Sequence, residues 1–125
     1  MKLLWYVALG SAVGGVTRVL VGSSIQERFT GAYPMGTFIV NITGSLALGF
    51  LMRYALATPT VSAEMRALLT TGFCGGYTTF STFSYESFTL GRADRFVSAA
   101  VYVAVSVTGG ILAACAGYLL ARRIA

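Results

Sequence analysis

Four long apolar runs alternate with short polar stretches along this chain. The runs cover residues 3–24, 35–56, 65–90 and 96–121. A membrane-spanning helix needs about 20 mostly apolar residues, and each run is long enough to supply one. The pattern therefore predicts an all-α integral membrane protein, in which residues 1–125 form a single domain of four transmembrane helices.

Residues typical of helix ends and of helix packing support these bounds. Pro34 precedes the second run, and proline favours the first turn of a helix. Ser62 precedes the third run and is a typical N-terminal cap. Gly10, Gly14 and Gly15 give the first run a small-residue pattern suited to close helix packing. No linker or internal repeat is visible.

The composition agrees with a protein that lies in a lipid bilayer. The chain is 56% hydrophobic and 10% charged, with a mean hydropathy of +0.76, whereas soluble domains carry about 25% charged residues. The net charge of +5 does not indicate nucleic-acid binding, because the basic residues mostly flank the apolar runs. Lys2 with the apolar residues after it resembles a signal peptide, but the apolar pattern continues past a typical h-region.

Few residues are suited to catalysis or to metal binding through side chains. The chain has no histidine, and Cys74 and Cys115 lie inside apolar runs without zinc-site or disulfide spacing. Free cysteine in such a position usually packs as a small hydrophobe. The acidic residues are scattered at Glu27, Glu64, Glu86 and Asp94. This pattern argues against an enzyme.

The third run contains an unusual polar and aromatic segment, residues 70–87. Gly72, Gly75 and Gly76 lie among several threonines and serines, and each glycine weakens a helix by about 1 kcal/mol relative to alanine. Irregular backbone inside a membrane must be buried in protein or line a watery cavity. We expect a break near residues 75–79, with carbonyl oxygens able to hold a cation. The alternative is a continuous helix packed through its glycines.

The spacing of side chains after this segment predicts two different faces. Phe80 and Phe83 are three residues apart and should share one face. Such a pair most often serves packing, but the electropositive edges of aromatic rings can also face an anion. Thr79, Thr82 and Glu86 fall on another face, and Glu86 lies either in a wet vestibule or at the membrane interface.

The other runs also contain polar groups. Asn41 offers two amide N–H donors within the second run. Placing an arginine such as Arg18 at the centre of a membrane helix costs at least about 2.5–3.5 kcal/mol. Its side chain therefore either faces a cavity or extends to the membrane interface. Tyr102 and Ser106, four residues apart, either line one face of a pathway or bond between helices. Donors outnumber acceptors in this set, which favours a path for a small anion that exchanges water for protein donors.

Lysine and arginine are distributed almost evenly between the two sides of the predicted topology. One side carries Lys2, Arg53, Arg66, Arg122 and Arg123. The other carries Arg28, Arg92 and Arg95, together with Arg18 if it extends that way. So small a difference in the number of basic residues barely favours one orientation of the protein in the membrane. Either one orientation is weakly set, or copies insert both ways and can form an antiparallel dimer.

Two motifs resemble the Fluc/CrcB family of fluoride channels. They are Gly-Thr-Phe-Ile-Val-Asn at residues 36–41 and Gly-Phe-Cys-Gly-Gly-Tyr-Thr-Thr-Phe-Ser-Thr-Phe-Ser at residues 72–84. The similarity extends over the whole chain. The resemblance implies a dual-topology, antiparallel homodimer with two pores in the bacterial plasma (inner) membrane. It also implies passive, selective export of fluoride, which protects the cell from its toxicity.

The resemblance further implies roles for individual residues. Phe80 and Phe83 match the aromatic pair that coordinates fluoride, and Asn41 matches a pore-lining amide. Gly75 and Thr78 match the backbone carbonyls that hold a structural sodium ion, with no organic cofactor. The remaining matches are the polar-track positions Ser81, Thr82, Tyr102 and Ser106, the vestibule acid Glu86, and the basic residue Arg18.

Two positions depart from the family pattern. Tyr77 stands where a leucine-like residue is expected. Gly110 lacks a hydroxyl that some relatives carry, so the polar track either is incomplete there or uses a neighbour such as Thr108. Two other functions make different demands on the sequence. A small multidrug transporter needs a carboxylate in the first run, which has Arg18 instead, and a non-transporting accessory subunit predicts no flux from the purified protein.

Overall fold

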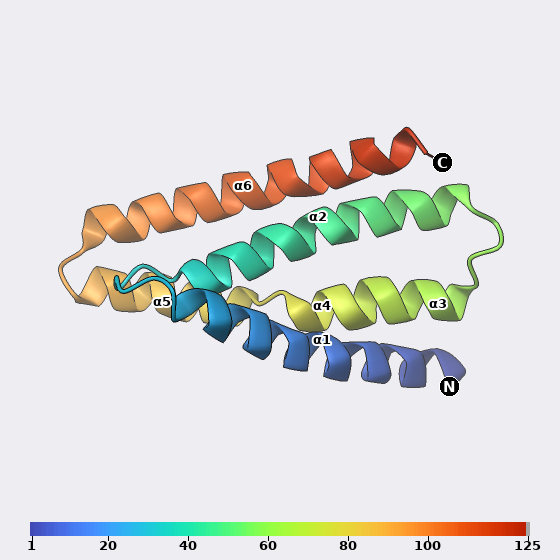
Figure 1. Cartoon of the computed structure of the whole chain (residues 1–125), viewed down its shortest axis with the longest axis horizontal. Helices are drawn as coiled ribbons and strands as arrows, with labels where there is room; N and C mark the ends of the chain where they lie inside the picture. Colours follow the sequence, from blue (N-terminus) through green and yellow to red (C-terminus); the bar gives the residue numbers. More distant parts are fainter. Residues whose placement is uncertain (125) are drawn as a thin grey trace.

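The computed structural model describes residues 1–124, which fold into a bundle of helices (Figure 1). Three helices are long: α1 (Lys2–Gln26), α2 (Met35–Ala57) and α6 (Phe96–Arg122). The segment between α2 and α6 is divided into α3 (Ala63–Ala67), the π-helix η1 (Leu68–Cys74), α4 (Gly75–Tyr77) and α5 (Phe80–Arg92). Residues 1–124 contain no β-strand, and the predicted all-α class is confirmed.

The three long helices are each long and apolar enough to cross a membrane. The chain is accordingly a multi-pass membrane protein. The expected third span, residues 65–90, does not meet this criterion as one helix, because the structure divides it into short elements and α5 is rich in serine and threonine. The structure thus supports three of the four expected spans as continuous membrane helices.

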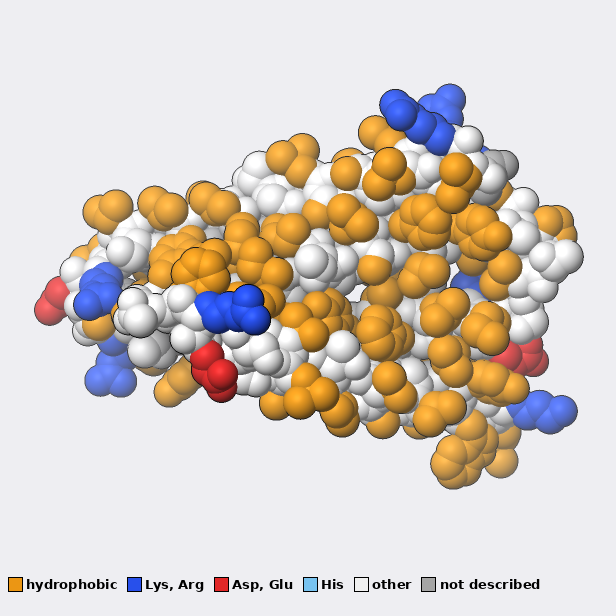
Figure 2. Space-filling model, viewed as in Figure 1, with side chains coloured by type: hydrophobic (Ala, Val, Ile, Leu, Met, Phe, Trp, Pro, Cys, Tyr) orange, Lys and Arg blue, Asp and Glu red, His pale blue; other side chains and the backbone are white. Residues whose placement is uncertain are grey.

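The chain runs back and forth along the length of the bundle. Both termini and the α2–α3 connection lie at one end, and the α1–α2 and α5–α6 connections lie at the other (Figure 1). Figure 2 shows hydrophobic side chains over the middle of the visible face and charged side chains toward its two ends. This distribution is the one expected of a bundle embedded in a bilayer.

Glycine allows the helices to approach closely at two places. A Cβ atom on Gly14 of α1 would collide with the Phe73 carbonyl oxygen of η1, and one on Gly117 of α6 would collide with the Leu46 carbonyl oxygen of α2. Gly15, in contrast, has open space where its Cβ would be. The small-residue pattern in the first run therefore correctly predicted close packing through Gly14, whereas Gly15 takes no part in it.

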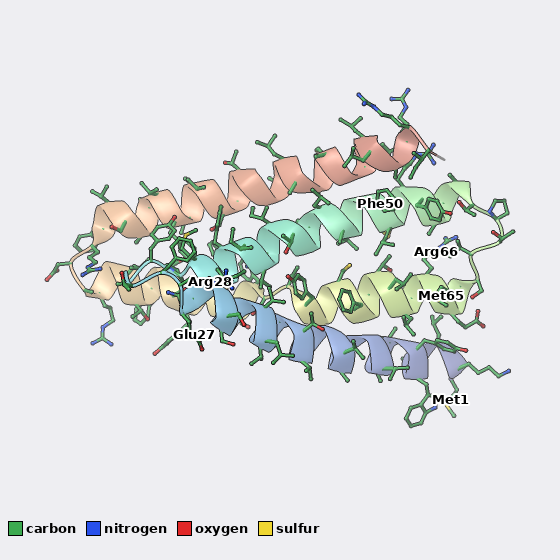
Figure 3. The ribbon with its side chains drawn as sticks, viewed as in Figure 1. Met1, Glu27, Arg28, Phe50, Met65 and Arg66 are labelled. Atoms are coloured by element: carbon green, nitrogen blue, oxygen red, sulfur yellow. The ribbon has the colours of Figure 1, made fainter. Side chains whose placement is uncertain are left out.

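Two side-chain hydrogen bonds fix helix α3 at the start of the segment between α2 and α6. Ser62 accepts a hydrogen bond from the Met65 amide (3.1 Å) and caps α3, as its position predicts. Arg66 extends from α3 toward α2 (Figure 3), where its Nη2 donates to the Ala55 carbonyl (2.9 Å). A cation near the last carbonyls of a helix also interacts favourably with the helix dipole. These bonds fix α3 beside the end of α2.

The helical backbone stops at Tyr77 and resumes at Phe80. Thr78 (φ −82°, ψ 160°) and Thr79 (φ −148°, ψ 113°) are both extended. Before them, η1 has the wider π-helical winding, which occurs often at functional sites. Thr79 caps the next helix by accepting a hydrogen bond from the Thr82 amide (3.2 Å). The interruption lies directly beside the polar residue Asn41 of α2.

Candidate functional site

Asn41 bridges the interrupted backbone at Thr79. Its Oδ1 accepts a hydrogen bond from the Thr79 amide at 2.7 Å, and its Nδ2 donates to the Thr79 carbonyl at 3.1 Å. Thr79 is buried, with 8% of its surface exposed, so unpaired backbone groups there would be costly. An amide nitrogen carries two N–H groups. Asn41 therefore retains one N–H for another acceptor while it stabilises the break.

The same bridge frees a carbonyl group upstream. In a continuous α-helix, the Thr79 N–H would bond to the carbonyl of Gly75. Because this N–H bonds to Asn41 instead, the Gly75 carbonyl loses that partner. Gly75 is exposed, and the position of its missing Cβ has no neighbour closer than 4.0 Å. The Thr78 carbonyl, in turn, lies 3.4 Å from Nη1 of Arg18.

A cavity of about 400 Å³ lies between the break and helices α2 and α6. Its polar lining residues are Asn41, Ser45, Thr78, Thr79 and Ser106. Its other lining residues include the two phenylalanines Phe80 and Phe83. We call this space the first cavity. It combines hydroxyl and amide donors with aromatic rings and contains no charged side chain.

The rings of Phe80 and Phe83 lie side by side but in different surroundings. Their centroids are 5.8 Å apart with an angle of 47° between the ring planes. Phe83 is buried (9% exposed) and packs against Tyr102, whereas Phe80 is 80% exposed. We expected the two rings to share one face. Both do line the first cavity, but they differ in burial. Phe80 is the first residue of α5, so its ring projects from the helix end instead of into the bundle.

Ser106 and Tyr102 do not line one face of the same cavity. Ser106 lines the first cavity, and its buried hydroxyl has no hydrogen-bond partner within residues 1–124. Tyr102 is fully buried, and its hydroxyl donates to Oε2 of Glu86 at 2.8 Å. Interhelical bonding, the alternative left open for this pair, is therefore the outcome for Tyr102. A buried hydroxyl without a partner is uncommon. The Ser106 hydroxyl is therefore available to donate a hydrogen bond to a ligand in the first cavity.

A second cavity of about 400 Å³ lies on the other side of Thr79. Thr79, Thr82 and Glu86 all line it, as their spacing predicts. Arg18 lines it too and is half-buried, so its side chain faces a cavity. The Oε1 atom of Glu86 accepts a hydrogen bond from the Thr37 hydroxyl at 2.7 Å. Each carboxylate oxygen of Glu86 thus has one hydroxyl donor.

The remaining predicted positions lie outside these two groups. Ser81 is exposed and lines neither cavity, although its hydroxyl lies 3.4 Å from that of Thr79. Thr108 is also exposed and lines neither cavity. The hydroxyl of Tyr77 lies 3.0 Å from that of Thr43, which gives the unexpected tyrosine a polar partner.

Three residues around the cavities were not predicted from the sequence. Thr37 lies within the motif 36–41 and binds Glu86. Gln26 accepts a hydrogen bond from the Gly36 amide (3.1 Å) and donates to the Tyr33 carbonyl (3.3 Å), which fixes the start of α2. Ser45 lies one helical turn after Asn41 and lines the first cavity. This i, i+4 relation to Asn41 was the available signal for Ser45.

Comparison with known proteins places the chain in a family. Residues 5–118 match the family model described as CrcB-like protein, Camphor Resistance (CrcB). A protein of Chlorobaculum tepidum named fluoride-specific ion channel FluC is 45% identical over 98% of this chain and 96% of its own. The FluC of Chloroflexus aurantiacus is 42% identical over 98% and 97%, and that of Aquifex aeolicus is 39% identical over 99% and 100%. The chain belongs to the CrcB family, which is a family of ion channels and not of enzymes.

Proposed function

We propose that this protein is a fluoride-selective channel that lets fluoride leave the cell passively and so gives resistance to its toxicity. The full-length similarity to proteins named fluoride-specific ion channels supports this function. The observation that carries it in this chain is the first cavity, where the unpartnered Ser106 hydroxyl and the spare Asn41 N–H accompany two phenylalanine rings. These groups donate to an anion without the tight hold of a buried lysine.

The proposed permeation path exchanges water for protein donors in steps. Fluoride is small and strongly hydrated, so it needs close donors at each step. Hydroxyl groups, the Asn41 amide and the electropositive edges of Phe80 and Phe83 supply them in turn. Larger halides gain less from such close contacts. In the second cavity, Arg18, Thr82 and the Glu86 network form the proposed polar vestibule. Ser81, which lines neither cavity, would join the polar track only through a rearrangement or a partner.

We further propose that the working unit is an antiparallel homodimer with two pores. Phe80, Tyr85 and Phe88 are 80%, 71% and 59% exposed on α5, an unusual aromatic surface for a helix near a polar cavity. A second copy would cover these side chains and close the open side of the first cavity. The segment α3–α5 would then form the fourth crossing of the membrane. The nearly even distribution of basic residues permits insertion in both orientations.

The Gly75 and Thr78 carbonyls at the break are suitable ligands for a structural sodium ion. Sodium is a hard cation that takes oxygen ligands, and the Gly75 carbonyl is released from its helical bond by Asn41. The Thr78 carbonyl accepts a hydrogen bond from Nη1 of Arg18 at 3.4 Å, and a sodium ion would bind this oxygen in place of that donor. In the proposed dimer, both copies would offer these two carbonyls, and the bound ion would hold the two breaks together. The proposal involves no organic cofactor.

Fluoride efflux from liposomes tests the function directly. Purified protein is reconstituted into vesicles loaded with potassium fluoride, and a fluoride electrode records release after valinomycin clamps the voltage. We expect rapid release of fluoride and at least tenfold slower release of chloride from matched vesicles. Release of fluoride no faster than from protein-free vesicles would contradict the channel function and would favour an accessory subunit.

A further inference from the structure

Helices α2 and α6 run side by side, and their contacts define levels along the first cavity. Gly109 of α6 faces Ile42 of α2, Gly110 faces Ser45, and Gly49 faces Ala114. Each pair keeps nearly the same offset in residue number, so the two helices run parallel. By this register, Asn41 lies at the level of Ser106, one helical turn before the level of Ser45 and Gly110.

The α6 wall of the first cavity has no side-chain donor after Ser106. Its later lining residues are Val107, Gly110, Ile111 and Ala114. An ion that leaves Ser106 along this wall meets no side-chain donor. The α2 wall has one more hydroxyl, because Ser45 lines the cavity and is followed there by Leu48. Ser45 is therefore the polar group that lies opposite the hydroxyl-free part of α6.

The Ser45 hydroxyl lies beside the position from which a side chain at residue 110 would extend. Its Oγ is 3.7 Å from the point that a Cβ of Gly110 would occupy, an ordinary van der Waals distance. Glycine at this position leaves the space in front of the hydroxyl open. One level farther on, a Cβ on Gly49 would collide with the Ala114 backbone, so the two helices close together beyond Ser45.

Hydroxyls in these helices usually bond to their own backbone, but Ser45 does not. Thr43, two residues earlier on α2, donates to the Ile39 carbonyl at 2.8 Å, and Ser84, Ser87 and Thr89 of α5 each bond to the carbonyl four residues before. Serine and threonine hydroxyls in helices commonly donate to the carbonyl one turn earlier in this way. Within residues 1–124 the buried hydroxyl of Ser106 has no hydrogen-bond partner. The half-buried Ser45 shows no such back-bond to α2, and both serines line the first cavity.

We infer that Ser45 of α2 is an anion-coordinating residue that replaces the hydroxyl missing at Gly110. This inference rests on the proposed fluoride pathway and adds a residue to it. Asn41 and Ser45 would bind the ion in turn along one face of α2, about 5.4 Å apart, the length of one helical turn. At the level of Gly110, α2 would thus supply the donor that α6 lacks.

Substitution of Ser45 tests this inference in the liposome efflux assay. Ser45→Ala removes the hydroxyl with almost no change in volume and suits a helix, because alanine has the best helix propensity. We expect fluoride efflux to fall at least tenfold, with an unchanged elution volume and melting temperature. Thr108→Ala removes an exposed hydroxyl outside the cavity on α6 and is the matched control, expected to stay within twofold of the unsubstituted protein.

A rescue experiment separates loss of a donor from loss of packing. The space beside Gly110 accommodates a serine, so Gly110→Ser in the Ser45→Ala background places a hydroxyl on the opposite wall. We expect this double variant to recover fluoride efflux to within threefold of the unsubstituted protein, while Gly110→Ala in the same background does not recover it. Recovery by alanine would show that volume, and not a donor, matters, and would overturn the inference.

The outcomes for Ser45 and for the channel function are distinguishable. If the unsubstituted protein conducts fluoride and Ser45→Ala conducts it as fast as Thr108→Ala, the role of Ser45 is refuted and the channel function stands. If the unsubstituted protein releases no fluoride, the proposed function fails, and the role of Ser45 fails with it. A tenfold loss that Gly110→Ser reverses supports both.

Discussion

Asn41 joins both backbone groups of Thr79, at 2.7 Å to its N–H and 3.1 Å to its carbonyl. One side chain of α2 thereby satisfies the interruption of the neighbouring segment. The same bond releases the carbonyl of Gly75, which the Thr79 N–H would engage in a continuous helix. A residue assigned to the pore from its amide donors therefore also maintains the shape of the break.

Replacing Asn41 should affect stability as well as transport. Asn41→Leu leaves two buried backbone groups without a partner, and each such group costs about 1–3 kcal/mol. Asn41→Asp keeps an acceptor for the Thr79 N–H but loses the donor to the Thr79 carbonyl. We expect the melting temperature in detergent to fall most for Asn41→Leu, with fluoride efflux abolished in both variants. An unchanged melting temperature for Asn41→Leu would argue against the bridge.

The two phenylalanines should respond differently to the same substitution. Phe80→Ile and Phe83→Ile are both expected to lower fluoride efflux at least tenfold, because both rings line the first cavity. Phe83 also packs against Tyr102 at 5.3 Å between ring centroids, so its replacement should cost about 0.5–3 kcal/mol of stability. Phe80 is 80% exposed in the protomer and should contribute less to its folding. Efflux at the unsubstituted rate in both variants would refute the aromatic assignment.

The Glu86 network should show coupling between its two donors. Thr37 and Tyr102 each donate to one carboxylate oxygen, from α2 and α6 respectively. Thr37→Val and Tyr102→Phe remove these donors singly, and a hydrogen bond to a charged group contributes about 1.5–3 kcal/mol. We expect a double-mutant cycle on thermal unfolding to give a coupling energy of about 0.5–3 kcal/mol, as is usual for groups in one network. Strictly additive losses would show that the two hydroxyls act independently.

Two adjacent glycines of α1 should tolerate alanine to different degrees. A Cβ on Gly14 collides with the Phe73 carbonyl oxygen, whereas a Cβ on Gly15 has open space. Gly15→Ala should be neutral or stabilising, since alanine exceeds glycine in helix propensity by about 1 kcal/mol. Gly14→Ala should separate α1 from η1 and lower the melting temperature. Equal melting temperatures for the two variants would contradict the packing described for α1.

Removal of sodium should weaken the proposed dimer. The Gly75 and Thr78 carbonyls carry no net charge and cannot be titrated, so the effect should depend on the cation and little on pH. We expect purified protein in N-methylglucamine chloride to show a lower melting temperature and lower flux than in sodium chloride at equal ionic strength. Potassium chloride controls for the size of the cation. Full activity and stability after exhaustive removal of sodium would exclude a structural role for the ion.

Hydropathy predicted the membrane class and four spans, of which three are long continuous helices in the structure. These features depend on local composition, because the bilayer excludes charge from about 20 consecutive residues wherever a helix crosses it. The spacing of Thr79, Thr82 and Glu86 predicted that they share one face, and all three line the second cavity.

Only the tertiary structure decided which polar group meets which. The helical period could not reveal that Tyr102 turns to Glu86 while Ser106 turns to the first cavity, because the direction depends on what the neighbouring helix offers. Nor could it place Ser45 in front of Gly110, a relation set by the register of α2 against α6. Contacts between helices arise from packing over distances that no sequence window spans, so they had to be seen in the folded chain.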